Sequence, residues 1–225
     1  MRMSDVLYFA GIIVAIISII ISTNVKGRFN KWSKHKNARR ISGKEVAERM
    51  LHNAGIYDVS VVQTPGTLTD HYDPRNKTVN LSDGVYDKAT IASVAVAAHE
   101  CGHAIQHKEG YAPLEFRNKL VPVANFGSKA GVWLFILGLV FSSMWLVDLG
   151  IVFFATCTLF AFITLPVEFN ASSRALNVLR GSEILMESEM GGARSVLSAA
   201  AMTYVASAAA SIIQLLRLIT IRRND

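Results

Sequence analysis

Residues 90–108 read TIASVAVAAHECGHAIQHK, and the interpretation of the whole chain starts from this stretch. Its apolar residues recur at helical intervals and Gly110 follows as a stop signal, so we predict one long helix from Thr90 to Lys108. Inside it, His99-Glu100-Cys101-Gly102-His103 matches the pattern H-E-x-x-H. Residues four apart on a helix differ by about 40° around the axis and by about 6 Å along it. Both imidazoles can therefore reach one metal ion.

The motif predicts a catalytic zinc site. Zinc binds neutral imidazole nitrogens at about 2.0–2.1 Å, which suits His99 and His103. Glu100 projects from the same turn, where it can take a proton from a zinc-activated water and deliver it to the leaving amine. Gly102 is expected to leave space beside the metal, at a cost of about 1 kcal/mol relative to alanine in a helix. The alternative interpretation is a pair of core histidines satisfied by hydrogen bonds.

The composition around this helix is that of a membrane protein. Of the 225 residues, 51% are hydrophobic and 18% are charged, compared with roughly 25% charged residues in soluble domains. A bilayer core requires about 20 apolar residues in a helix. We therefore predict three to four transmembrane helices, in the uncharged runs Val6–Thr23, Ala130–Val147, Leu149–Val167 and, with weaker membrane affinity, Ser195–Leu216.

The last of these runs has two interpretations. Ser195–Leu216 is rich in alanine and serine, so it either spans the membrane or packs as a buried helix on the catalytic domain. Spanning places Arg222 and Arg223 outside the cell, against the positive-inside tendency.

The two central runs are separated only by Asp148, so we predict a membrane hairpin that turns at this residue. A hairpin returns the chain to the side that it left. His99, before the hairpin, and Glu168, after it, are therefore expected to face the same aqueous compartment.

A catalytic zinc also needs a third protein ligand and an open position for water. His107 lies about 12 Å along the helix from His99, too far to share one ion. Asp148 is excluded because it lies at the far end of the hairpin. We predict Glu168, which opens an expected helix over residues 169–180. A first-turn acid favoured by the helix dipole is a second interpretation of Glu168, compatible with the first.

The segment between the first apolar run and the motif has the pattern of a folded aqueous domain. Ser42 and Glu45 have capping-box spacing ahead of a helical stripe that ends near Gly55. Residues Asp58–Gln63 and Lys77–Leu81 are predicted strands with a proline-containing turn signal between them. A small sheet or hairpin is expected.

The net charge of +6 comes largely from Lys26–Lys44, a segment without acids that directly follows the apolar run Val6–Thr23. Because the basic residues follow the run, we predict an uncleaved anchor with its N-terminus outside and Lys26 onward in the cytoplasm, against anionic lipid. This interpretation leaves no role for nucleic acid, which we do not expect as a partner. Cys101 and Cys157 provide no disulfide framework and no CxxC metal pair.

Two segments carry a family resemblance. Residues 97–106, AAHECGHAIQ, and residues 165–172, LPVEFNAS, resemble the YugP-type neutral zinc metallopeptidases of bacterial membranes. Residues 70–74, DHYDP, and 200–206, AAMTYVA, resemble the same family, so the likeness covers nearly the whole chain. The resemblance implies a zinc peptidase in the cytoplasmic membrane of a bacterium.

A more distant resemblance concerns the third ligand. The element Glu168-x-x-Ala171-Ser172-x-x-Ala175 is similar to E-x-x-A-D-x-x-A of HtpX-type membrane peptidases, in which the glutamate is the third zinc ligand. This supports Glu168. Because Ser172 stands where those relatives carry aspartate, a carboxylate bond to a ligand histidine is not expected, and a serine hydroxyl is the weaker substitute. The fold of related enzymes also implies that Lys77–Leu81 is an edge strand that pairs with extended substrate, with an ordinary sheet strand as the alternative.

A developing oxyanion needs a hydrogen-bond donor, and three residues have suitable chemistry: His71, Tyr204 and Arg174. Each has a structural alternative. His71 is otherwise a turn histidine bonded to Asp70 or Asp73, and Tyr204 a core ring with a satisfied hydroxyl. Arg174 is otherwise a partner for phospholipid or for Glu183.

The sequence therefore predicts a mainly α membrane protein with a small α+β zincin-like catalytic domain, facing the cytoplasm. Its predicted function is that of a metalloendopeptidase with one zinc ion and polypeptide substrates. The alternative is a non-catalytic, zinc-stabilised membrane protein that serves as a partner-binding scaffold. The expected domains are an anchor (1–25), a basic juxtamembrane segment (26–41), a catalytic domain (42–120), a transmembrane hairpin (121–167), the third-ligand helix with the rest of the catalytic domain (168–194) and an apolar C-terminal helix (195–225).

Overall fold

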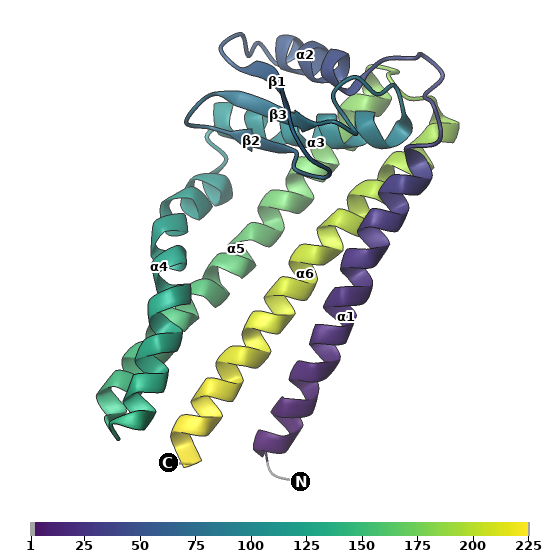
Figure 1. Ribbon diagram of the computed structural model, residues 1–225. Coiled ribbons are helices and arrows are strands. Elements are labelled where there is room, and N and C mark those ends of the chain that lie inside the picture. Colours follow the sequence, from purple (N-terminus) through teal and green to yellow (C-terminus); the bar gives the residue numbers. More distant parts are fainter. Residues whose placement is uncertain (1–2, 225) are drawn as a thin grey trace. The chain divides into compact units, whose positions relative to one another are not determined.

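A computed structural model describes residues 3–224, and this part of the chain is mainly helical (Figure 1). It forms two compact units. Residues 22–114 and 167–202 make up the sheet unit, and residues 3–21, 115–166 and 203–224 belong to the helical unit. The elements in chain order are α1 (Met3–Trp32), α2 (Gly43–Asn53), β1 (Ser60–Thr64), β2 (His71–Asp73), β3 (Thr78–Ser82), α3 (Ile91–Lys108), α4 (Ala112–Val140), α5 (Met144–Gly181) and α6 (Glu187–Asn224).

Within residues 3–224, four helices are long and apolar enough to cross a membrane. They cover Val6–Trp32, Ala112–Val140, Met144–Gly181 and Glu187–Arg223. The run Ser195–Leu216, for which the sequence left two interpretations, belongs to the last of them. The predicted mainly helical fold is therefore confirmed. By length and composition, the described residues also contain the larger of the two predicted numbers of spans, four.

In the helical unit, α4 and α5 form a hairpin, but its turn lies at residues 141–143 and not at Asp148 as predicted. Ser142 adopts a left-handed conformation with φ of 52°, which reverses the chain there. Small residues let the two helices approach closely, because a Cβ added to Gly131 would lie 3.1 Å from the Gly150 carbonyl oxygen. Asp148 lies inside α5 and accepts a hydrogen bond of 2.8 Å from Nε of Arg222 on α6.

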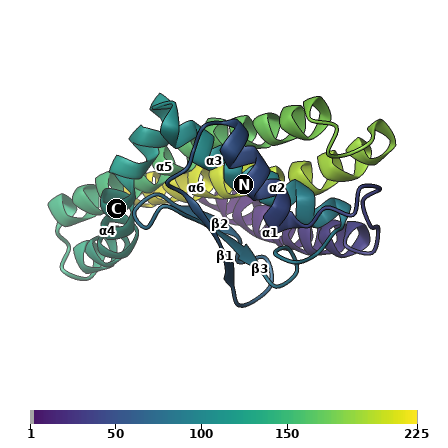
Figure 2. The same cartoon turned by 90° about the horizontal axis from the view of Figure 1, so that it is seen from above.

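Two helices of the sheet unit, α2 and α3, have ends that are specified locally. The predicted capping box of α2 is confirmed, since Ser42 and Glu45 each bond the other's backbone N–H. The predicted helix over Thr90–Lys108 is confirmed as α3, which starts after the N-cap Thr90 and ends before Gly110 at φ of 62°. Both α2 and the sheet pack against α3, as the view from above shows (Figure 2).

The sheet of the described residues has the strand order β1-β3-β2, with β1 parallel and β2 antiparallel to β3. Both predicted strands exist with slightly shifted ends, whereas β2 was not predicted. The predicted edge position of residues 77–81 is wrong, because β3 lies between the other two strands. The physical reason is burial: Val79 and Leu81 are fully buried in the core, so this strand is covered on its inner face and paired on both sides.

The separate helix predicted over residues 169–180 is also wrong, because α5 runs unbroken from Met144 to Gly181 through Pro166. Proline removes one backbone hydrogen bond, which an apolar helix packed on its neighbours tolerates. Glu168 therefore lies in the helix interior, and the interpretation of this residue as a first-turn acid favoured by the helix dipole is ruled out.

Candidate metal centre

The candidate centre forms in the sheet unit, where α3 and α5 approach each other at Gly102. A Cβ added to Gly102 would lie 2.8 Å from the Ala171 carbonyl oxygen and 3.2 Å from its Cα. Alanine at this position cannot be accommodated without moving one helix. The expectation that Gly102 leaves space beside the metal needs correction: the space that it leaves is filled by the backbone of α5.

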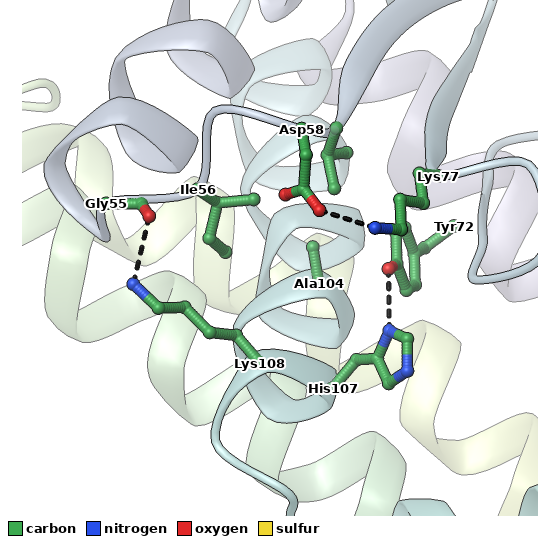
Figure 3. A pocket seen from close by; sticks show the side chains of 9 residues that line it. Gly55, Ile56, Asp58, Tyr72, Lys77, Ala104, His107 and Lys108 are labelled. Carbon is green, nitrogen blue, oxygen red and sulfur yellow. Dashed lines mark hydrogen bonds and ion pairs between the residues drawn. The ribbon is translucent and has the colours of Figure 1, made fainter.

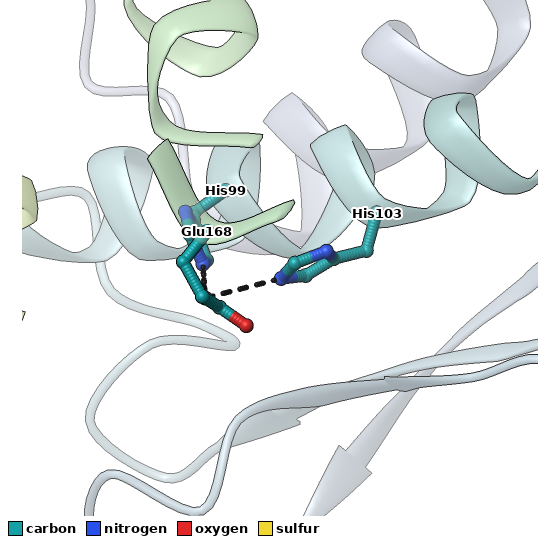
Figure 4. Close-up of side chains that lie close together, drawn as sticks. All are labelled: His99, His103 and Glu168. Atoms are coloured by element: carbon teal, nitrogen blue, oxygen red, sulfur yellow. Dashed lines mark hydrogen bonds and ion pairs between the residues drawn. The ribbon is translucent and has the colours of Figure 1, made fainter. Parts of the chain in front are cut away.

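This close approach brings together His99, His103 and Glu168 (Figure 4). Nε2 of His99 lies 3.3 Å from Oε2 of Glu168, and Nε2 of His103 lies 3.6 Å from the same oxygen. The possible ligand atoms of all three residues lie within 4.8 Å of one another. The three side chains are only 14%, 9% and 4% exposed, so the cluster is largely buried.

The geometry of this cluster fits a small tetrahedral metal ion. Two ligand atoms that are each about 2.0–2.1 Å from such an ion lie about 3.3 Å apart. The two imidazole–carboxylate separations, 3.3 and 3.6 Å, are close to that value. Two imidazole nitrogens and one carboxylate oxygen are also the donor set of catalytic zinc sites that keep a fourth position open.

The outer nitrogens of both histidines have partners of their own. Nδ1 of His99 lies 3.1 Å from the Ser172 hydroxyl, so the contact for which the sequence suggested serine as a weaker substitute is present. Nδ1 of His103 lies 3.0 Å from Oε1 of Gln106. Gln106 was missed as a site residue, although its position one turn after His103 on the same helix was a usable signal. These contacts leave Nε2 of each ring directed at Glu168.

Glu100 lies on the buried side of α3, with 8% of its surface exposed. Burial raises the pKa of its carboxyl from 4.5 to about 7. The strand β2 packs against α3, the helix that carries Glu100.

The three candidate oxyanion donors differ in their positions. His71 begins β2, and its Nδ1 lies 2.8 Å from the Thr69 carbonyl oxygen, so the predicted bond to Asp70 or Asp73 is replaced by a backbone contact. Tyr204 belongs to the part of α6 that lies in the helical unit. Arg174 bonds Asn170 and Glu109.

Of the two structural alternatives predicted for Arg174, phospholipid and Glu183, the second is wrong, because Arg174 pairs with Glu109 and Glu183 pairs with Arg39 at 3.0 Å.

The other histidine on α3, His107, points into a different region. Its Nδ1 lies 2.8 Å from the Tyr72 hydroxyl, at a cavity of about 190 Å³ that Lys77 and Lys108 also line (Figure 3). It is not among the residues that cluster with His99. Asp148, which was excluded on topological grounds, is paired with Arg222.

The fold and this cluster define a mainly helical protein that has four candidate membrane spans in its described residues and a buried group of two histidines and one glutamate fit to hold a metal ion. The chain belongs to the family described as "Putative neutral zinc metallopeptidase", whose sequence model matches residues 7–223. It is 46% identical over 200 residues to the "Putative membrane protease YugP" of Bacillus subtilis (strain 168). The matched region covers 89% of each of the two chains. The predicted family resemblance is confirmed. No solved structure matches the chain.

Proposed function

We propose that the protein is a membrane-anchored metalloendopeptidase in which His99, His103 and Glu168 hold one zinc ion. The observation that carries this proposal is the convergence of their three ligand atoms within 4.8 Å, in a chain of a zinc metallopeptidase family. His99 and His103 come from consecutive turns of α3, while Glu168 is supplied by α5 from 65 positions beyond His103. A zincin-like catalytic domain, built from α3 and the sheet, is part of the same proposal.

The residues around the proposed zinc position have separate roles in the reaction. Zinc, when bound, supplies the Lewis-acid chemistry that activates water for attack on a peptide carbonyl. Glu100 takes the proton of the attacking water and delivers it to the leaving amine. Its buried position beside His99 limits access of bulk water to the reacting groups. His71, at the start of β2, is the donor that we assign to the developing oxyanion, because β2 packs against α3, the helix that carries Glu100.

The substrate in this proposal is an extended polypeptide that pairs with β2. Within the described residues, β2 pairs only with β3, so its other edge is free for backbone hydrogen bonds. This strand packs against α3, the helix that carries Glu100. We therefore assign to β2 the pairing with extended substrate that the family resemblance implied for residues 77–81.

We further propose that the sheet unit faces the cytoplasm of a bacterial cell. The support is the basic segment Lys26–Lys44, which belongs to this unit and follows the most apolar part of α1. Anionic lipid of the cytoplasmic leaflet attracts such segments. The N-terminus then lies outside the cell.

The activity is tested with purified protein in detergent and an unfolded reporter such as casein. We expect wild-type protein to cleave casein, chelator to abolish cleavage, and Glu100→Gln to lose it while zinc content stays unchanged. Glu48→Gln, at an exposed position of α2, is the matched control and should cleave normally. Equal cleavage by wild type and Glu100→Gln would reject the proposal. Zinc binding without cleavage by any form would favour the scaffold function.

The ligand role of Glu168 has its own test. Glu168→Gln keeps the size of the side chain but removes the charge that neutralises a divalent ion, so zinc occupancy should fall at least tenfold at limiting zinc. Metal analysis after dialysis measures this, with the exposed Glu187→Gln on α6 as control. Full zinc retention together with normal turnover would assign the third ligand elsewhere.

A further inference from the structure

A chain of polar contacts runs from His103 to the surface of the sheet unit. Gln106 is fully buried, and its Nε2 donates to the Val167 carbonyl oxygen and to Oδ1 of Asn170, each at 2.9 Å. The same Asn170 oxygen accepts a bond of 2.7 Å from Nε of Arg174. Arg174 in turn pairs with Glu109 at 2.7 Å. The chain thus connects α3 and α5 immediately behind one of the proposed zinc ligands.

Arg174 decides how the Asn170 amide is oriented. A guanidinium group has only donors, so the Asn170 atom that faces Arg174 must be the acceptor oxygen. If the amide were rotated by 180°, two N–H donors would face each other across 2.7 Å. The ion pair with Glu109 holds the guanidinium in place for this contact.

The orientation of Asn170 then decides that of Gln106. Both the Asn170 oxygen and the Val167 carbonyl oxygen can only accept hydrogen bonds, so the Gln106 atom between them must be the NH₂ group. Both protons of that group are used in these two bonds. The Gln106 oxygen therefore faces Nδ1 of His103, at 3.0 Å.

An acceptor oxygen at this position requires a proton on Nδ1 of His103. We propose that Arg174, acting through Asn170 and Gln106, fixes His103 in the Nδ1-protonated tautomer and so directs the lone pair of Nε2 at the metal position. This inference rests on the proposed function for its consequence, zinc affinity, but not for the tautomer itself. Arg174, Asn170 and Gln106 are positioning residues, since none of them is a proposed ligand.

The second histidine ligand has no equivalent device. His99 contacts the Ser172 hydroxyl, which can rotate to donate or to accept and therefore imposes no tautomer. The lone pair of His103 Nε2 and the Glu168 carboxylate, 3.6 Å apart, are both acceptors, and a cation between them completes this arrangement. The site is thus preorganised from the His103 side.

The tautomer is read directly by long-range ¹H–¹⁵N correlation on ¹⁵N-histidine protein, zinc-free and at a pH where His103 is neutral. The His103→Asn variant identifies the resonance among those of the six histidines. We expect wild type to show the Nδ1-protonated form, and Gln106→Leu and Arg174→Met to show a mixture of tautomers. Asn170→Asp and Arg174→Lys preserve the acceptor and the donor and should behave as wild type.

The zinc dissociation constant, measured by chelator competition, is the second readout. Gln106→Leu should raise it roughly 10- to 100-fold, and Arg174→Met by a smaller factor in the same direction. Arg180→Met is the matched control, because Arg180 lies on the same helix in an exposed ion pair with Glu187. It should leave both readouts unchanged.

Two results would overturn the inference: protonation of wild-type His103 at Nε2, or an unchanged tautomer in folded Gln106→Leu and Arg174→Met. The wild-type measurement can overturn the inference even when a variant does not fold. Failure of wild type to bind zinc would reject the proposed function but not the tautomer, so the two failures are distinguishable.

Discussion

Glu100 is an ionisable residue held where ionisation is costly. Its side chain lies beside His99 in the buried face of α3, and burial is the largest cause of its raised pKa. Within residues 3–224, no hydrogen bond to its carboxylate compensates for the lost water. A carboxyl in this environment exchanges its proton near neutral pH, the property that a general base and acid requires.

The cost of ionising Glu100 predicts a pH dependence of stability in zinc-free protein. The folded-state pKa, about 7, exceeds the unfolded value of 4.5, so the folded state binds more protons between these values. The contribution of Glu100 to the free energy of unfolding is therefore fully present below pH 4.5 and declines as the pH rises to 7, by on the order of 3 kcal/mol. Thermal unfolding of wild type and Glu100→Gln in chelator measures this. A decline of the same size in both proteins would contradict the prediction.

At the scale of elements, the candidate site depends on the contact between α3 and α5. These helices meet at Gly102 and Ala171, where backbone faces backbone without an intervening side chain. The contact places Glu168, one turn before Ala171, opposite the two imidazoles. It also places Ser172 and Asn170 behind them, so one helix supplies the proposed third ligand and the residues that position the other two.

Gly102→Ala should therefore weaken the site although alanine is the better helix former. The added Cβ forces the helices apart, which costs up to about 3 kcal/mol and thus outweighs the gain of about 1 kcal/mol in helix propensity. We expect a lower unfolding temperature and at least tenfold weaker zinc binding, measured by calorimetry and chelator competition.

Gly191→Ala is the control for this substitution. An added Cβ meets nothing within 4 Å there, so this variant should be as stable as wild type or more so. Unchanged zinc affinity in Gly102→Ala would show that the close approach is not needed.

At the scale of the whole molecule, an ion pair in the helical unit indicates which helix ends lie on the same side of the membrane. Asp148 and Arg222 form an ion pair of 2.8 Å, so the start of α5 and the end of α6 lie at the same side. If this end of α6 lies outside the cell, as in the proposed orientation, the pairing of Asp148 with Arg222 offsets the arginine charge that the positive-inside tendency disfavours there. In the proposed orientation this side is outside the cell.

The orientation predicts a labelling pattern in intact cells. In a Cys157→Ala background, cysteine introduced by Ser142→Cys at the hairpin turn or by Arg223→Cys should react with a membrane-impermeant maleimide. Lys34→Cys should react only after the cells are permeabilised, because the proposed orientation places the basic segment in the cytoplasm. Labelling of Lys34→Cys in intact cells would show that the orientation is the opposite of the proposed one.

The sequence by itself determined the features that depend on neighbours along the chain. The helix over residues 90–108, the capping box of Ser42 and Glu45 and the apolar runs all follow from local spacing, and local spacing sets helix termini and spans. The grouping of His99 with His103 was accessible for the same reason, and the family was accessible from the resemblance of segments such as residues 97–106 and 165–172.

Only the tertiary structure decided what depends on distant segments. The central place of β3, the unbroken course of α5 through Pro166 and the true neighbour of Gly102 are set by packing between residues far apart in the chain. The partners of Gln106, 61 and 64 positions away, belong to the same class. Local propensity cannot predict such contacts, because burial against another element outweighs the small free-energy preferences of single residues.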